Sequence, residues 1–173
     1  LREKPRHSQG LDATTGRIIS LGYQIDDGPV KIISAANTII EYDMLSRFFD
    51  HIDLELVKSK GRVMFIGHNI IGFDLPYIWR RSKILGVTVP PYIPSPAELK
   101  PWSDRIFDTM IEWAGTRDRI SLDRLCRLFD IDGKDGMDGS DVWQYYKDGR
   151  QAEIDAYCAS DIAKTHELWM RLR

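Results

Sequence analysis

Residues 63–74 read Val63-Met64-Phe65-Ile66-Gly67-His68-Asn69-Ile70-Ile71-Gly72-Phe73-Asp74. The first four form a short, continuously apolar run, which predicts a central strand covered on both faces. Asp74 and Pro76 then suit the first turn of a helix, which we expect to end near Leu85. A strand that leads through a loop into a helix places that loop at the carboxyl edge of the sheet, where α/β proteins commonly bind ligands. Asp74 is therefore a candidate functional residue, with a helix-capping aspartate as the alternative.

The rest of the chain alternates strands with helices. Strands are predicted at residues 17–25, 30–35 and 105–109, the first two as a hairpin. Helices are predicted at residues 42–56 and 109–113, after the capping residues Ser121 and Ser140, and from about Gln151 to Leu172. This order predicts an α/β fold with a mixed central sheet, as a single domain over residues 17–173. Residues 1–16 are polar and aperiodic, and we expect an N-terminal arm there.

Composition narrows the class of protein. The 173 residues are 43% hydrophobic and 29% charged, an ordinary globular balance. No apolar run approaches the roughly 20 residues of a membrane span, and the two cysteines, Cys126 and Cys158, predict reduced thiols in a cytoplasmic protein. The net charge of −2 argues against a protein that coats nucleic acid by bulk electrostatics. It does not argue against an enzyme that grips a few phosphates beside an acidic metal site.

A second chemistry-bearing pattern lies in the last predicted helix. Tyr157 and Asp161 are four residues apart, so they share one helical face. A carboxylate there can bind a divalent cation through hard oxygen ligands, and the tyrosine hydroxyl can orient a water molecule. The alternative is a tyrosine at the edge of the core and a solvated aspartate, since this spacing alone is weak evidence.

Taken in order, these segments resemble a DEDD-type 3′→5′ exonuclease of the tyrosine subclass, on the ribonuclease H-like fold. Residues 69–74 correspond to the second exonuclease motif of that family and residues 157–161 to the third. Ala156 stands where the sister subclass has histidine. The resemblance covers roughly residues 17–172 and is closest to predicted exonucleases related to the proofreading domain of family B DNA polymerases.

The resemblance implies a catalytic site for nucleic acid with a free 3′ end, DNA being favoured over RNA. Two divalent cations, Mg²⁺ or Mn²⁺, would act about 3.5–4 Å apart in a two-metal mechanism. Asp74 and Asp161 would be metal ligands, and Tyr157 would position the attacking water. Phe73 would stack on the terminal base, and Asn69 would contact the terminal nucleotide or the backbone.

Three further residues are possible supporting groups, each with a structural alternative. Asp108 is either a supporting carboxylate or a helix cap. His68 either touches a phosphate or packs at the end of a strand. Lys134 is a possible phosphate contact in a Gly- and Asp-rich loop that we expect to border the substrate cleft. Most of the five tryptophans are expected in the core.

The first motif of the family, Asp-x-Glu on the first central strand, is not visible. Residues 11–16 resemble its usual form, but Leu11 and Ala13 stand where the two carboxylates belong. Without that strand the sheet would divide into two parts, so we expect the motif to lie upstream of Leu1 or to be missing. Two functions stay open: a metal-dependent 3′→5′ exonuclease, and a catalytically inactive nuclease-like module that binds nucleic acid.

Overall fold

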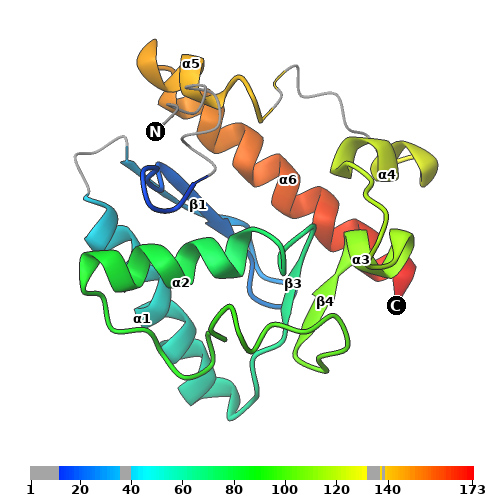
Figure 1. Cartoon of the computed structure of the whole chain (residues 1–173), viewed down its shortest axis with the longest axis horizontal. Coiled ribbons are helices and arrows are strands. Elements are labelled where there is room, and N and C mark those ends of the chain that lie inside the picture. The colour runs from blue at the N-terminus through cyan, green and yellow to red at the C-terminus, as the bar shows by residue number, and fades with distance from the viewer. Residues whose placement is uncertain (1–11, 36–39, 132–136, 138) are drawn as a thin grey trace.

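The computed structural model describes residues 12–35, 40–131, 137 and 139–173 (Figure 1). Within these residues it has mixed α/β architecture, as the alternation of strands and helices predicts. The elements in chain order are β1 (Ser20–Tyr23), β2 (Lys31–Ser34), α1 (Glu41–Ser59), β3 (Phe65–Gly67), α2 (Asp74–Leu85), β4 (Ile106–Asp108), α3 (Thr109–Ala114), α4 (Leu122–Leu128), α5 (Val142–Lys147) and α6 (Gln151–Leu172).

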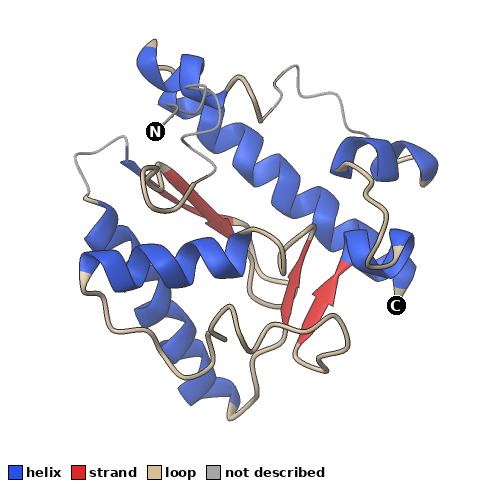
Figure 2. Cartoon of the chain, in the orientation of Figure 1, coloured by secondary structure: helices blue, strands red, loops and turns tan. Residues whose placement is uncertain are grey.

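The strands form two separate pairs. Strand β1 pairs antiparallel with β2, with Leu21 opposite Ile33, and β3 pairs parallel with β4, with Ile66 opposite Phe107. No strand among the described residues joins β1 to β3. Figure 2 shows the two pairs with the long helix α6 running past both, and α6 packs against β1, β2 and β3. This division is the one expected of a sheet that lacks its first central strand.

A glycine allows α6 to lie close to β1. A methyl group at Gly22 would stand 2.7 Å from the Cys158 sulfur and 3.2 Å from a side-chain carbon of Ile162, both on α6. A larger residue at this position would therefore require these side chains to shift. Gly22 thus permits the close packing of β1 against the helix that carries Tyr157 and Asp161.

The main core forms where α1 meets the β1–β2 pair. The predicted apolar spacing of this helix is confirmed, because five of its side chains are buried at helical intervals: Met44, Leu45, Phe48, Phe49 and Ile52. A second cluster joins α4 to α6 through Leu125, Cys126 and Leu168. A third, formed by Ile70, Leu75 and Ile106, lies under the loop that ends at Asp74.

The turn at residues 12–16 is fastened to the domain. Arg81 donates from Nη1 to the carbonyl of Ala13 at 3.0 Å, and its Nη2 lies 2.7 Å from Oε2 of Glu41. The other carboxylate oxygen of Glu41 accepts from the backbone N–H of Ile18 at 2.9 Å. This ion pair thus connects α1, α2 and the segment that leads into β1.

Two local predictions are wrong. Asp141, not Ser140, precedes α5. The tryptophans are not core residues: Trp102, Trp113 and Trp143 are exposed, and the other two are only half-buried. The core of α1 contains Phe48 and Phe49 with aliphatic side chains, and no tryptophan among the described residues is fully buried. None of the described helices is both long enough and apolar enough to cross a membrane.

Candidate active site

The loop between β3 and α2 is a tight turn built on Asn69. The carbonyl of Asn69 accepts hydrogen bonds from the N–H groups of Gly72 and Phe73, at 3.1 and 2.9 Å. Asn69 has a positive φ of 58°, a left-handed conformation that asparagine tolerates better than most residues. A Cβ atom at Gly72 would overlap the Asn69 side-chain oxygen. Asn69 and Gly72 thus have a conformational reason to occur together, besides the substrate contact predicted for Asn69.

Asp108 holds this loop in place from β4. Its Oδ1 accepts from the N–H of Asn69 at 2.9 Å, and its Oδ2 accepts from the N–H of Ile71 at 3.1 Å. The same carboxylate caps α3 by accepting from the N–H groups of Met110 and Ile111. Asp108 is 5% exposed, so these four donors replace the water that it lacks. Of the two alternatives for Asp108, this geometry favours the structural cap.

His68 is also held by protein groups on both sides of its ring. Its Nε2 lies 2.9 Å from the carbonyl oxygen of Ile120, and its Nδ1 lies 2.9 Å from Oγ1 of Thr109. A carbonyl only accepts, so the Nε2–H donates to it, and in the neutral ring Nδ1 accepts from the threonine hydroxyl, which also lies 3.3 Å from the carbonyl oxygen of Gly67. Burial lowers the pKa of His68 and so favours this neutral form. The geometry therefore favours a packed histidine over a phosphate contact.

Asp74 begins α2, as the sequence predicts. Although the residue is exposed at the surface, protein atoms crowd its carboxyl group, and this desolvation raises its pKa to about 7. The Asp74 backbone N–H opposes this rise, and the negative charges of Asp108 and then Asp161 add smaller increases to the pKa. Asp74 therefore lies within electrostatic reach of Asp161, which α6 supplies from 87 residues further along the chain.

Phe73, immediately before Asp74, packs against α2. Its ring centroid lies 5.3 Å from that of Tyr77, and the two rings are inclined at 42°. Phe73 remains half-buried, so part of it is accessible beside Asp74. The structure thus places the predicted stacking residue next to the first candidate metal ligand.

On α6, a lysine that sequence reasoning missed accompanies Asp161. The Nζ atom of Lys164 lies 3.9 Å from Oδ1 of Asp161 and 3.9 Å from Oδ1 of Asp123 on α4. Only 5% of the Lys164 side chain is exposed, although lysine is rarely buried unless it is paired. The spacing of three residues between Asp161 and Lys164 was a usable signal, because such residues are neighbours on a helix.

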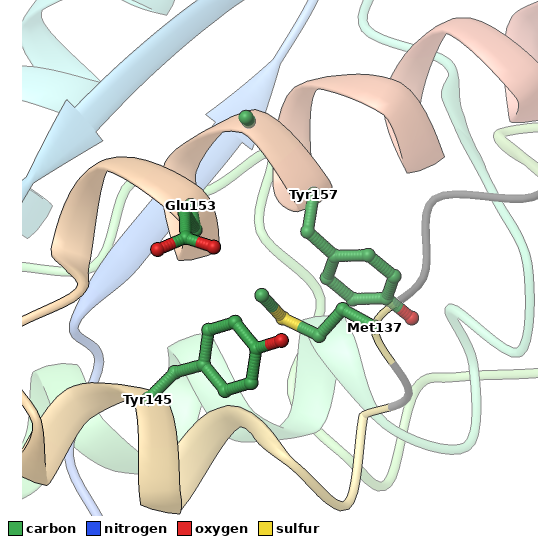
Figure 3. Close-up of a pocket in the computed structure, with 5 residues that line it drawn as sticks. Met137, Tyr145, Glu153 and Tyr157 are labelled. Atoms are coloured by element: carbon green, nitrogen blue, oxygen red, sulfur yellow. The ribbon is translucent and has the colours of Figure 1, made fainter.

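Tyr157 lines a cavity of about 220 Å³ one helical turn before Asp161 (Figure 3). The other residues around this cavity are Met137, Tyr145, Glu153 and Ala156. Ala156 is small and exposed, so the position where the sister subclass carries histidine leaves space here. The tyrosine predicted to position water therefore borders a cavity, on the same helix as Asp161.

The structure thus brings Asp74, Asp161 and Phe73 to one region, while Asp108 and His68 support the loop beside them. Lys134 lies outside the described residues. Within the described part of the chain, no three His, Cys, Asp or Glu side chains are grouped so as to hold a metal ion. Asp74 and Asp161 are therefore only part of a set of metal ligands.

Comparison with known proteins identifies the family of the chain. Residues 12–173 match the family of predicted 3′–5′ exonucleases related to the exonuclease domain of PolB. No curated protein matches the chain. The match includes both candidate carboxylates and all the described strands and helices, and the mixed α/β architecture is consistent with a ribonuclease H-like exonuclease domain. The chain therefore belongs to the family of predicted 3′–5′ exonucleases related to the exonuclease domain of PolB.

Proposed function

We propose that this chain is a metal-dependent 3′→5′ exonuclease of the tyrosine subclass, which hydrolyses phosphodiester bonds at nucleic-acid 3′ ends. The observation that supports this most is the electrostatic proximity of Asp74 and Asp161. They come from different helices, and a fixed loop and a packed helix bring them to one place. We favour DNA over RNA as substrate, because the family is related to the exonuclease domain of a DNA polymerase.

The chemistry of this pair suits divalent cations. Burial is the main reason that the pKa of Asp74 is raised, and the nearby negative charge of Asp161 adds to it, so a cation held by both carboxylates would favour the charged form of Asp74. Carboxylate oxygens are the ligands that Mg²⁺ and Mn²⁺ prefer, so Asp74 and Asp161 would hold such ions. When bound, two cations would stabilise the attacking and leaving oxygens of the displacement.

The remaining residues of the site would bind and orient. Tyr157 would use its hydroxyl to hold the attacking water, and Phe73 would stack on the terminal base. Asn69 would position the terminal nucleotide through the turn that it maintains. The cytoplasm remains the proposed location, on the basis of the free thiols Cys126 and Cys158.

We further propose that an additional strand between β1 and β3 supplies the Asp-x-Glu carboxylates of the first motif. The support is the division of the sheet together with α6, which packs against strands of both pairs. A strand there would pair with edges that the described strands leave open.

A second candidate function rests on the small number of ligands. Because no group of three metal-binding side chains occurs among the described residues, an inactive nuclease-like module that binds nucleic acid is the alternative. Such a module would bind a strand and release nothing from it. Hydrolysis separates the two functions.

The test is the stepwise shortening of a 5′-labelled single strand in the presence of Mg²⁺. We expect shortening from the 3′ end that is abolished by a chelator, by Asp74→Asn and by Asp161→Asn. Asp155→Asn is the matched control, since Asp155 lies on the same helix and accepts from Gln151 at 2.9 Å. Equal shortening by Asp74→Asn and the unaltered chain would contradict the proposal, and binding without shortening would support the inactive module.

A further inference from the structure

The cavity beside Tyr157 has one wall that the exonuclease chemistry does not use. That wall is formed by Tyr145 of α5 and Glu153 of α6, and Figure 3 shows both side chains, with Met137, directed into the same space as Tyr157. At about 220 Å³ the cavity is smaller than the roughly 300–1,000 Å³ of pockets that hold whole small molecules. It therefore suits a single ring system.

One guanidinium group contacts both side chains of this wall. Arg150 lies over the ring of Tyr145, with its central carbon 3.9 Å from the ring centroid. The same side chain donates from Nε to Oε1 of Glu153 at 2.6 Å. The Arg150–Glu153 pair is exposed, with 44% and 50% of the two side chains accessible, so a ligand can compete with it for the carboxylate.

The outer surface of α5 also carries aromatic rings with cations beside them. This helix has no buried residue, although it contains three aromatic side chains. Lys147 lies 5.4 Å from the ring centroid of Trp143, and Arg17 lies 4.9 Å from that of Tyr146. Accessible rings beside cations are the combination by which proteins bind single-stranded nucleic acid, with rings under bases and cations beside phosphates, and on α5 Trp143 is exposed while Tyr145 and Tyr146 are half-buried.

We propose that the cavity receives one unpaired nucleobase of the substrate strand, stacked on the ring of Tyr145. The inference rests on the proposed exonuclease function and adds to it a base-binding site formed by α5 and α6, apart from the stacking surface proposed for Phe73. The thioether of Met137 provides a polarisable apolar contact for the base. Glu153 provides an acceptor that an exocyclic amino group of cytosine or adenine can reach.

Single-strandedness follows from the size of the cavity. A base that enters a space for one ring system must first leave its partner, which costs a few kcal/mol in a duplex and little in a single strand. A blunt duplex end is therefore a poorer ligand than a single strand of the same sequence. The cations Arg17 and Lys147 then hold the neighbouring phosphates, and this part of the affinity falls as salt increases.

The experiment measures binding of a 5′-fluorescein-labelled single-stranded oligodeoxynucleotide by fluorescence anisotropy, in a chelator so that no hydrolysis occurs. Tyr145→Ala should weaken binding about 5- to 150-fold, the range for the loss of one base–aromatic stack. Tyr145→Trp keeps a stacking ring and should restore affinity. Trp102→Ala is the matched control, because Trp102 is 79% exposed and lies before β4. Circular dichroism checks that each variant is folded.

The proposal is overturned if Tyr145→Ala binds as tightly as the unaltered chain, or if Trp102→Ala weakens binding equally. Absence of binding by the unaltered chain, or equal binding of a blunt duplex, also overturns it. The exonuclease function is tested separately. If binding depends on Tyr145 but no Mg²⁺-dependent shortening occurs, the base site stands and the exonuclease function is refuted. If the chain shortens the strand but Tyr145→Ala leaves the Kd unchanged, the exonuclease function stands and the base site is refuted.

Discussion

The two candidate metal ligands are held in opposite ways. Asp74 follows a loop whose shape is fixed by hydrogen bonds: Asp108 accepts four backbone N–H groups, and His68 uses both ring nitrogens. Asp161 lies on a 22-residue helix, where Lys164 pairs with it at 3.9 Å. The loop needs a network to hold its shape, whereas the helix positions Asp161 by its own periodicity. A substitution that removes the hydrogen bonds of the loop should therefore lower the free energy of unfolding far more than loss of the Lys164 charge beside Asp161.

The largest effect is expected from Asp108→Ala. This change leaves the N–H groups of Asn69 and Ile71 without an acceptor and removes the cap of α3, so we expect a loss of about 3–5 kcal/mol in the free energy of unfolding. Urea denaturation measures it. Asp104→Ala is the matched control, since Asp104 is exposed two residues before β4, and should change stability by less than about 0.5 kcal/mol. Similar losses in the two variants would refute the assigned role of Asp108.

A smaller effect should appear when the pH is lowered. Burial lowers the pKa of His68 below its usual 6.5, against opposing effects of Ile120 and Asp108. Below pH 6.5 the unfolded chain therefore binds a proton that the folded chain resists, and stability falls as the pH decreases towards the folded-state pKa. His68→Gln cannot gain this proton, so its unfolding free energy should decline less between pH 7 and pH 5. Denaturant titrations at both pH values measure the difference, and parallel declines would exclude His68 as the cause.

The smallest effect is expected from Lys164→Met on α6. Its partners Asp161 and Asp123 are 30% and 52% exposed, so neither becomes a buried, unpaired charge when the lysine is replaced. Methionine keeps an unbranched apolar stem and avoids the cost of burying an ammonium group, so stability should change by less than about 1 kcal/mol. A loss as large as that of Asp108→Ala would show that α6 depends on a polar network as the loop does.

Local patterns explain which parts of the fold the sequence could predict. Asp74 and Pro76 indicated the start of α2, and the apolar spacing of residues 42–56 indicated α1, because both signals lie within a few turns of chain. The roles of Asp108 and His68 stayed undecided in the sequence. Apart from the N–H groups of α3 that Asp108 caps, their partners are 37–52 residues away, so only the folded chain reveals them.

The candidate site was predictable to a similar degree. Asp74 and Asp161 could be selected from motif spacing, but their proximity depends on how α2 and α6 pack. Burial of Lys164 depends on α4, and its spacing from Asp161 indicated a pair without indicating burial. The prediction of buried tryptophans was wrong, because aromatic content alone does not show which rings remain on the surface, as Trp143 does on α5.

The central claim is that Asp74 and Asp161 bind the same cations although they are held so differently. Mn²⁺ titration followed by NMR tests this most directly, because the paramagnetic ion broadens the signals of nearby amides even when it binds weakly. We predict that the amide signals of residues 69–74 and 157–164 broaden together at the lowest Mn²⁺ concentrations, and that Asp74→Asn or Asp161→Asn reduces broadening in both segments. Broadening confined to one segment, or unchanged in both variants, would contradict the account.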